Sequence, residues 1–132
     1  MGNTLSIRVV AMDDDYDILR LLRIKLEKEG FIVTTAVDGE KGVKAVLKDK
    51  PDVMIVDVMM PKKNGYQVLE EVKEKFGDKS PIAIMLTSKA QPGDLVEGLS
   101  KGADDYITKP FSPSELIERI NVSLIKRGYK PE

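Results

Sequence analysis

The sequence predicts an α/β fold in which helices cover both faces of an open, doubly wound parallel sheet. Two observations carry the prediction: five strand-like segments alternate with five helix-like segments over 132 residues, and the strand-like segments are continuously apolar. Continuous apolar runs indicate strands buried on both faces, as in a parallel sheet covered by helices. Right-handed crossovers then give a three-layer sandwich. A chain of this length forms one domain with a real hydrophobic core.

The first part of the chain contains two strand–helix pairs. Residues 7–12 are a short apolar run rich in β-branched side chains, which predicts a buried strand. Residues 17–30 place apolar side chains at helical spacing, and Gly30 is a natural C-terminal stop. Residues 31–37 are again strand-like, and residues 39–50 carry the apolar stripe of a short amphipathic helix.

The middle of the chain repeats this alternation. Residues 52–57 and 81–87 are the third and fourth predicted strands, and residues 66–77 place three apolar side chains on one helical face. Residues 93–102 form the weakest predicted helix because a glycine lies inside it. Residues 105–108 are the fifth, short strand.

The last predicted helix spans residues 112–128. It opens with a capping-box pattern, because Glu115 follows Ser112 by three positions, and Pro113 takes the first helical position. The sequence therefore supplies its own start signal for this helix.

The composition excludes several classes of function. The chain has no cysteine and no histidine, so disulfides, thiolate or imidazole metal sites and a phosphohistidine carrier are excluded. The 21 basic and 22 acidic residues give a net charge of −1, without the basic excess typical of nucleic-acid binding. No segment is typical of a signal peptide or a membrane span. We therefore expect a cytoplasmic protein without nucleic-acid or membrane contacts.

Polar side chains follow four of the predicted strands, whose carboxyl ends meet at one edge of a doubly wound sheet. They are Asp13, Asp14 and Asp15 after the first strand, Asp57 after the third, Thr87 and Ser88 after the fourth, and Lys109 after the fifth, where Pro110 follows it. Carboxylates from separate strands repel one another unless a cation joins them, and oxygen-only ligands favour Mg²⁺. A lysine and a hydroxyl beside such an ion match the oxygens of a phosphoryl group. Asp57, alone at the end of an apolar strand, is the best candidate for an aspartyl nucleophile.

Each of these residues also has an ordinary structural interpretation. Aspartates that precede a helix cap it, and we assign this role mainly to Asp15 and Asp17. Taken alone, Asp57 would start an Asx turn, Thr87 would be a β-branched strand residue, and Lys109 would be a solvated surface lysine. The convergence of all these strand ends on one edge favours a functional site.

The order of four segments resembles the receiver domain of bacterial response regulators. The segments are DDDYDIL, PDVMIVDVMMPKKNG, IMLTSKA and GADDYITKPFSPSEL. The resemblance runs from about Ile7 to Leu124, and it implies a flavodoxin-like fold with strand order 2-1-3-4-5. It also implies a division of the chain into a leader over 1–6, a receiver domain over 7–127 and a tail over 128–132.

The resemblance further implies how phosphorylation would occur. Asp57 would accept a phosphoryl group from a histidine kinase or a phosphotransfer protein. Asp14 and Asp57 would bind Mg²⁺ directly, Asp13 would hold the ion through water, and the backbone carbonyl of Met59 would complete the protein ligands. Lys109 would pair with Asp57 before transfer and with the phosphoryl group afterwards.

The same resemblance implies a conformational switch. Thr87 would contact a phosphoryl oxygen, and Tyr106 would be the aromatic residue whose ring turns inward when Thr87 moves. The simpler interpretation of Tyr106 is an ordinary strand aromatic. The switch would alter the face formed by the fourth helix, fifth strand and fifth helix, roughly residues 93–125.

Two outputs fit a receiver with so little chain after it. One is a stand-alone receiver that binds a downstream effector protein or relays phosphate, and the other is the receiver part of a DNA-binding response regulator with a fused effector domain. The segment GLSKGADDYITKPFSPSELIERI resembles the OmpR-type subfamily. That resemblance implies a phosphorylation-dependent homodimer, in which Asp104 or Asp105 would pair with Arg119 of the other subunit. Leu95 and Asn121 depart from the subfamily pattern.

The alternative is an aspartyl-nucleophile phosphatase of similar α/β fold. Such enzymes usually carry an acid–base aspartate two residues after the nucleophile, where this chain has Met59. We therefore expect self-phosphorylation and slow self-dephosphorylation instead of enzymatic turnover. A nucleotide- or flavin-binding site is disfavoured, because no glycine-rich phosphate loop follows the first strand.

Overall fold

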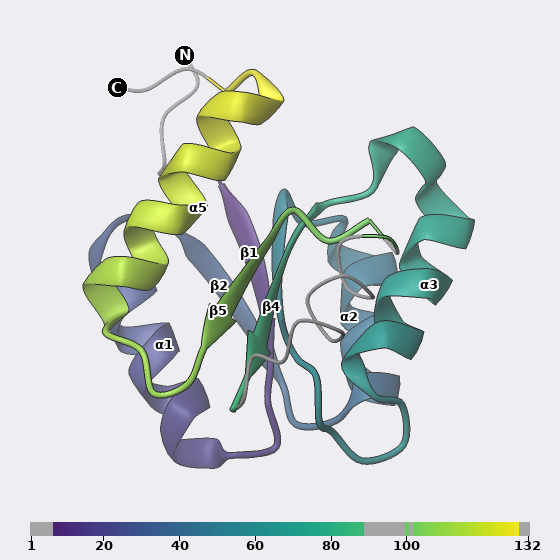
Figure 1. Cartoon of the computed structure of the whole chain (residues 1–132), viewed down its shortest axis with the longest axis horizontal. Helices are drawn as coiled ribbons and strands as arrows, with labels where there is room; N and C mark the ends of the chain where they lie inside the picture. The colour runs from purple at the N-terminus through teal and green to yellow at the C-terminus, as the bar shows by residue number, and fades with distance from the viewer. Residues whose placement is uncertain (1–6, 89–99, 101, 130–132) are drawn as a thin grey trace.

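The computed structural model describes residues 7–88, 100 and 102–129. The elements in this part of the chain are β1 (Arg8–Met12), α1 (Tyr16–Lys28), β2 (Ile32–Ala36), α2 (Gly39–Asp49), β3 (Val53–Asp57), α3 (Gly65–Phe76), the 3₁₀ turn η2 (Gly77–Lys79), β4 (Ile82–Thr87), β5 (Asp105–Thr108) and α5 (Pro113–Arg127). Figure 1 shows them as one sheet between helices. Every predicted strand is present, with bounds within one residue of the prediction.

The five strands form one parallel sheet in the order β2-β1-β3-β4-β5, which confirms the predicted topology. The chain reverses its direction of winding between β1 and β3, so the switch point lies there. Met12 pairs with Val56 in the register of these two strands. The residues that follow them, Asp13 and Asp57, are therefore placed side by side at the carboxyl edge of the sheet.

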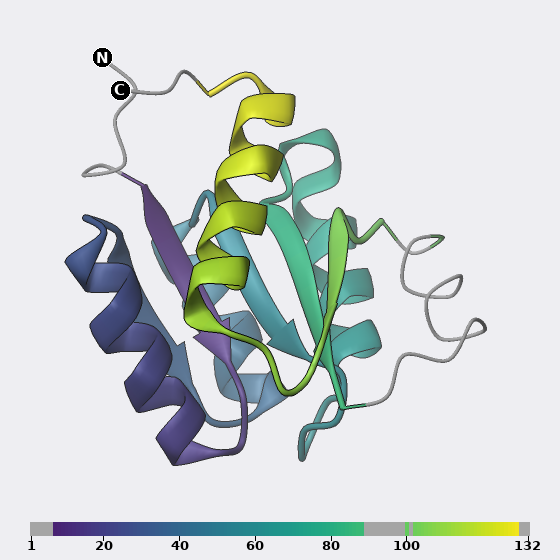
Figure 2. The same cartoon turned by 60° about the vertical axis from the view of Figure 1, so that its left-hand side comes forward.

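Helices α1 and α5 lie side by side on one face of the sheet, and α2 and α3 cover the other, as both views show (Figures 1 and 2). Each face has its own apolar core, because the strand side chains alternate between the two faces. The helical side chains buried under α1 and α5 are Leu19, Leu22, Leu26, Leu116, Ile120 and Leu124. Those buried under α2 and α3 are Val43, Val46, Val68, Leu69 and Val72. Strand β3 is buried along its whole length, which makes it a rigid support for its last residue.

The helices begin where the sequence supplies caps. The Asp15 side chain accepts hydrogen bonds from the backbone N–H groups of Asp17 and Ile18, so Asp15 caps α1, whereas Asp17 lies in the first turn. Ser112 caps α5 by accepting from the Glu115 N–H at 3.0 Å. The Glu115 carboxylate lies near Arg119. The described residues show a complete capping box at α3, formed by Asn64 and Gln67, which the sequence pattern did not single out.

One predicted element is largely outside the described residues. The predicted fourth helix over 93–102 lies outside the described residues except for Ser100, which is helical, and Gly102. Four α-helices, instead of the predicted five, are therefore seen in the part of the chain that the structure describes. Among these, none is long and apolar enough to cross a membrane.

Tyr129, predicted to lie in the tail, returns to the domain. Its ring packs against the core under α1 and α5, and its hydroxyl donates a hydrogen bond to Asp52 Oδ1 at 2.6 Å. The other carboxylate oxygen of Asp52 accepts from the Arg8 N–H at 2.9 Å. The end of α5 is thereby fastened to the amino ends of β1 and β3, at the edge of the sheet away from the predicted site.

Candidate functional site at the carboxyl edge of the sheet

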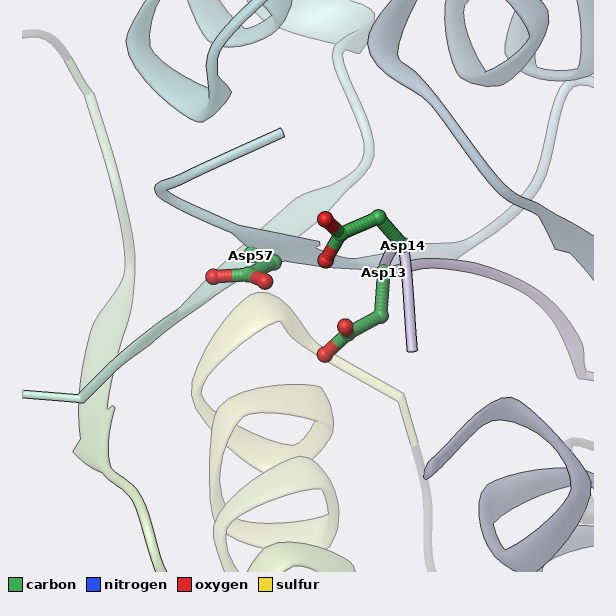
Figure 3. Close-up of side chains that lie close together, drawn as sticks. All are labelled: Asp13, Asp14 and Asp57. Carbon is green, nitrogen blue, oxygen red and sulfur yellow. The ribbon is translucent and has the colours of Figure 1, made fainter. Parts of the chain in front are cut away.

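Three carboxylates meet where β1 and β3 end. Asp13, Asp14 and Asp57 each offer an oxygen within 4.8 Å of the others, and Figure 3 shows the three groups gathered at one place. Asp13 and Asp57 are buried, with 0% and 5% of their surface exposed, whereas Asp14 is exposed. The site is therefore buried at Asp13 and Asp57 and open to solvent on the Asp14 side.

Asp13 is held by hydrogen bonds of its backbone and of both carboxylate oxygens. Its backbone N–H donates to the Ala36 carbonyl at 3.1 Å, which continues the pairing of β1 with β2. Its Oδ1 accepts from the Asp15 N–H at 2.9 Å, and its Oδ2 accepts from the Lys109 ammonium at 2.7 Å. A fully buried carboxylate needs such partners, because an unpaired charge inside a protein is costly.

Asp57 ends β3 and is held by one amide and one ammonium. Its Oδ1 accepts from the Met59 N–H at 3.2 Å, and its Oδ2 accepts from Lys109 Nζ at 3.2 Å. The first of these bonds is the Asx turn that the sequence allowed. Because the same carboxylate also contacts Lys109 and lies beside two other carboxylates, the turn does not exclude a reactive role.

The loop after Asp57 passes so close to the strand that only glycine fits at position 65. A Cβ there would lie 2.6 Å from the Asp57 carbonyl oxygen and 2.9 Å from the Val58 Cα. The Gly65 N–H donates to the Val58 carbonyl at 2.8 Å. The first turn of α3 is therefore seated directly on the backbone that carries Asp57.

Lys109 joins the two buried aspartates. Its ammonium bridges Asp13 and Asp57, its side chain is 18% exposed, and its backbone N–H donates to the Thr87 carbonyl at 2.6 Å. The peptide bond from Lys109 to Pro110 is cis. Burial lowers the pKa of Lys109, but the hydrogen bond and charge of Asp13, with a smaller contribution from Asp57, outweigh it and raise the pKa above 10.5. The lysine therefore stays cationic.

Asp57 is an unusually weak acid at this position. Burial and the neighbouring negative charge of Asp13 raise its pKa from 3.8 to about 6, although Lys109 and the Met59 N–H act in the opposite direction. The single positive charge of Lys109 thus does not offset the negative charge of the clustered carboxylates fully. An additional cation at this edge would favour the ionised form of Asp57.

The donor set fits Mg²⁺. With all groups ionised, three carboxylates and one ammonium leave two negative charges, which a divalent cation would balance. The side-chain ligands are all oxygen, the type that Mg²⁺ prefers, and the exposed Asp14 side leaves room for the waters that Mg²⁺ retains. The predicted contribution of the Met59 carbonyl stays a prediction. The Met59 side chain is 72% exposed beside the site.

The two residues predicted to switch lie on β4 and β5, the strands that follow β3 in the sheet. Thr87 ends β4 and is 7% exposed, and Tyr106 on β5 is 9% exposed and belongs to the core under α2 and α3. The hydroxyls of Tyr106 and Tyr66 are hydrogen bonded to each other. Tyr66 was not singled out from the sequence, because no local pattern marks a tyrosine at a helix start as the partner of a strand residue. The structure shows the buried position of the Tyr106 ring, and its second position stays a prediction.

The residues predicted to pair across a dimer are engaged within the chain. Arg119 Nη1 lies 2.9 Å from Asp105 Oδ1, and Arg127 Nη2 lies 3.3 Å from Asp104 Oδ2. These pairs are partly exposed, so they would exchange partners at low cost. The predicted cross-subunit pairing is untested.

The comparisons with known proteins agree on one family. Residues 9–121 match the model of the response regulator receiver domain. The Francisella response regulator 1452 receiver domain is 32% identical, with a TM-score of 0.85 over 92% of this chain and 99% of that one. The chemotaxis protein CheY4 of Vibrio cholerae is 31% identical, with a TM-score of 0.85 over 89% and 98%. A CheY-like receiver domain protein from Methanospirillum hungatei JF-1 is 30% identical, with a TM-score of 0.86 over 92% and 95%.

Proposed function

Because this chain belongs to the response regulator receiver family, and is thus a phosphorylation-dependent switch of two-component signalling, we propose that Asp57 is its phosphoacceptor. The observation that carries the proposal is the place of Asp57. It ends the fully buried strand β3, beside the buried Asp13 and 3.2 Å from the Lys109 ammonium. A rigid strand thus presents one carboxylate oxygen to an incoming phosphorus atom, and positioning is the chief demand of phosphoryl transfer.

The phosphoryl donor is a histidine kinase or a phosphotransfer protein. An oxygen of the Asp57 carboxylate forms a bond to phosphorus while the bond from phosphorus to the imidazole nitrogen of the donor breaks, and the imidazole leaves with that electron pair. Asp57 must be ionised to attack, and Lys109 favours the ionised form. After transfer, Lys109 pairs with a phosphoryl oxygen and the Thr87 hydroxyl donates to another.

Receiver domains bind Mg²⁺ at an acidic pocket, and this chain has such a cluster in Asp13, Asp14 and Asp57. We assign Asp14 and Asp57 as direct ligands, Asp13 as a ligand through water, and the Met59 carbonyl as the remaining protein ligand. The ion supplies positive charge that offsets the carboxylates and the phosphoryl oxygens. The two unbalanced negative charges of the site support this assignment.

The output follows from the position of Thr87 and Tyr106. In the proposed switch, Thr87 moves toward the phosphoryl group and the Tyr106 ring is held in the buried position that the structure shows. This would alter the face of β5 and α5 together with the segment before them. The partner of this face is a downstream effector protein, a fused effector domain or a second copy of the chain. On α5 this face includes the exposed apolar side chains of Val122 and Ile125.

Self-phosphorylation from a small phosphodonor tests the assignment of Asp57. Incubation with acetyl phosphate and Mg²⁺ should add one phosphoryl group to the native chain, measured by intact mass, and none to Asp57→Asn. The matched control is Asp78→Asn, because Asp78 is an exposed carboxylate in η2 and precedes β4. Full labelling of Asp57→Asn would show that another residue accepts the phosphoryl group.

Turnover on external substrates is the alternative. The position two residues after Asp57 holds Met59, whose thioether cannot donate or accept a proton as an acid–base aspartate does. We therefore expect no multiple-turnover release of phosphate from phosphate esters. Sustained release that depends on Asp57 would establish a phosphatase instead.

A further inference from the structure

Two tyrosine hydroxyls meet between α3 and the edge strand β5. Tyr66 is the second residue of α3, Tyr106 is the second residue of β5, and their hydroxyls share a hydrogen bond across 40 positions of sequence. Tyr106 is 9% exposed and lies in the core under α2 and α3, against which the partly buried Tyr66 also packs. The contact therefore links a helix to the strand of the proposed switch.

A phenol that turns inward must find a partner for its hydroxyl. Burying a hydroxyl without a hydrogen bond is unfavourable, so a buried tyrosine usually has a partner at its tip. In this chain the Tyr66 hydroxyl is such a partner for Tyr106. The buried position of the Tyr106 ring is thus stabilised by a group on another element.

Tyr66 lies in the first turn of α3, which packs closely against the end of β3. Its neighbour Gly65 lies so close to β3 that a Cβ there would be 2.6 Å from the Asp57 carbonyl oxygen. The capping box of Asn64 and Gln67 fixes the same turn of the helix. Tyr66 therefore stands at a fixed place relative to Asp57, whereas β5 lies at the edge of the sheet, bonded on one side to β4.

We propose that Tyr66 is a positioning residue of the switch, and that its hydroxyl holds the Tyr106 ring in the buried position. The inference rests on the proposed role of Tyr106, in which the buried ring accompanies the phosphorylated form. Tyr66 then sets how strongly that form is favoured, without contacting the phosphoryl group.

Removal of one hydroxyl and removal of both have opposite consequences. In Tyr66→Phe, the Tyr106 hydroxyl loses this partner while the ring is buried, so the buried position becomes less favourable. In the double variant with Tyr106→Phe, no hydroxyl remains to be satisfied, and an apolar ring is buried readily. Loss of both partners of a hydrogen bond is often nearly neutral, whereas loss of one is not.

Binding of beryllofluoride, a phosphoryl mimic, measures the effect. The apparent affinity in the presence of Mg²⁺, determined by calorimetry, should fall about fivefold in Tyr66→Phe, as expected for one net hydrogen bond. The double variant should return to within about twofold of the native chain. If Tyr66 only stabilised α3, adding Tyr106→Phe to Tyr66→Phe would not restore the affinity for beryllofluoride.

A matched control separates this effect from general stability. Tyr129→Phe also removes a hydrogen-bonded tyrosine hydroxyl, but that hydroxyl contacts Asp52, far from the site. This variant should lower the free energy of unfolding in urea and leave beryllofluoride affinity unchanged. An equal loss of affinity in Tyr129→Phe would assign the Tyr66→Phe effect to stability and overturn the proposal.

The ring position is measured directly by NMR. The chain has four tyrosines and no tryptophan, so ¹³C labels on the tyrosine rings give few signals. A soluble paramagnetic probe should broaden the Tyr106 ring signal more in Tyr66→Phe than in the native chain. Unchanged protection of Tyr106, or a double variant that binds beryllofluoride more weakly than Tyr66→Phe, would overturn the proposal.

Failure of the switch and failure of the Tyr66 inference give different results. If Tyr106→Ala leaves the beryllofluoride-induced changes in amide exchange intact, the switch role of Tyr106 is wrong. If Tyr106→Ala abolishes those changes while Tyr66→Phe keeps native affinity and ring protection, the switch stands and Tyr66 does not control it.

Discussion

The ammonium of Lys109 lies closer to Asp13 than to the proposed phosphoacceptor. Nζ is 2.7 Å from Asp13 Oδ2 and 3.2 Å from Asp57 Oδ2. The family resemblance implied the Asp57 contact and did not imply that Asp13 is the nearer partner. Because Asp13 is fully buried, Lys109 stabilises the metal-free fold in addition to its proposed role at the phosphoryl group.

Lys109→Ala should destabilise the metal-free protein. Its loss leaves two buried carboxylates uncompensated, and we expect the free energy of unfolding in EDTA to fall by about 2 kcal/mol, less than for a fully buried pair. Mg²⁺ should restore much of this loss. Urea unfolding with EDTA or Mg²⁺ measures both effects, with Lys44→Ala on the exposed side of α2 as control. Equal losses in the two variants would contradict a charge role for Lys109.

Lys109→Ala also separates phosphorylation of the site from the response that phosphorylation causes. Lys109→Ala should still be labelled by acetyl phosphate, because Mg²⁺ supplies much of the charge compensation. The phosphorylated variant should nevertheless fail to change its partner binding or dimerisation, because the proposed ammonium–phosphoryl pair is missing. Intact mass measures the labelling, and analytical ultracentrifugation measures the dimerisation. A native response of the labelled variant would count against this role.

Asp57 should make the stability of the metal-free protein depend on pH. Its pKa is raised in the folded state from 3.8 to about 6, so the folded state binds this proton more tightly than the unfolded chain. The contribution is fully present below pH 3.8 and is lost as the pH rises through about 6. The loss amounts to about 3 kcal/mol at most, since one pKa unit corresponds to about 1.4 kcal/mol.

Comparison with Asp57→Asn isolates this contribution from other carboxylates. The stability of the native chain minus that of the variant, measured by urea unfolding in EDTA, should decrease from pH 4 to pH 7. Mg²⁺ should flatten the curve. A difference that is constant over this range would show that the pKa of Asp57 is not raised, and a difference that increases would show that it is lowered.

Asp14 and Asp15 should respond in opposite ways to replacement by alanine. Asp14→Ala removes an exposed oxygen of the carboxylate cluster, so Mg²⁺ affinity should fall by at least about tenfold while metal-free stability does not decrease. Asp15→Ala removes the N-cap of α1 and should cost about 1 kcal/mol of stability with Mg²⁺ affinity retained. Calorimetric Mg²⁺ titration and urea unfolding distinguish them. Loss of stability in Asp14→Ala would favour a capping role for Asp14.

Gly65→Ala should disturb the strand that carries Asp57. The new Cβ would meet the Asp57 carbonyl oxygen at 2.6 Å, and we expect a loss of about 2 kcal/mol or more and slower labelling by acetyl phosphate. Gly77→Ala is the control, because its Cβ would meet no atom within 4 Å, although its positive φ of 57° makes the change unfavourable. It should lose about 1 kcal/mol with normal labelling. Normal labelling of Gly65→Ala would show that the site tolerates movement of this loop.

Beryllofluoride with Mg²⁺ should change amide exchange on the output face. We expect the changes on β5 and α5, within the predicted region 93–125, because in the proposed switch Thr87 and Tyr106 connect that face to Asp57. Hydrogen exchange followed by mass spectrometry measures these changes, with Asp57→Asn as the control. Changes confined to the loops around the carboxylates would exclude this route.

Much of the fold was predictable because it is specified by short-range patterns. The apolar runs of β1, β3 and β4 and the cap at Asp15 are local properties, and parallel topology then forces Asp13, Asp57, Thr87 and Lys109 to one edge. The family resemblance supplied the strand order and the candidate roles. The bounds of most elements followed, because each α-helix that the structure describes begins at a cap and each strand ends where its apolar run ends.

Two of the pairings at and near the site were decided by tertiary structure alone. Lys109 and Asp13 are 96 positions apart, and Tyr66 and Tyr106 are 40 apart, so no local pattern records that they meet. The need for glycine at position 65 arises only because α3 is seated against the β3 backbone. The sequence determined which groups reach the site, through periodicity and topology. Which of them pair, and how weak an acid Asp57 becomes, depends on burial and on distances that are set only when the elements pack together.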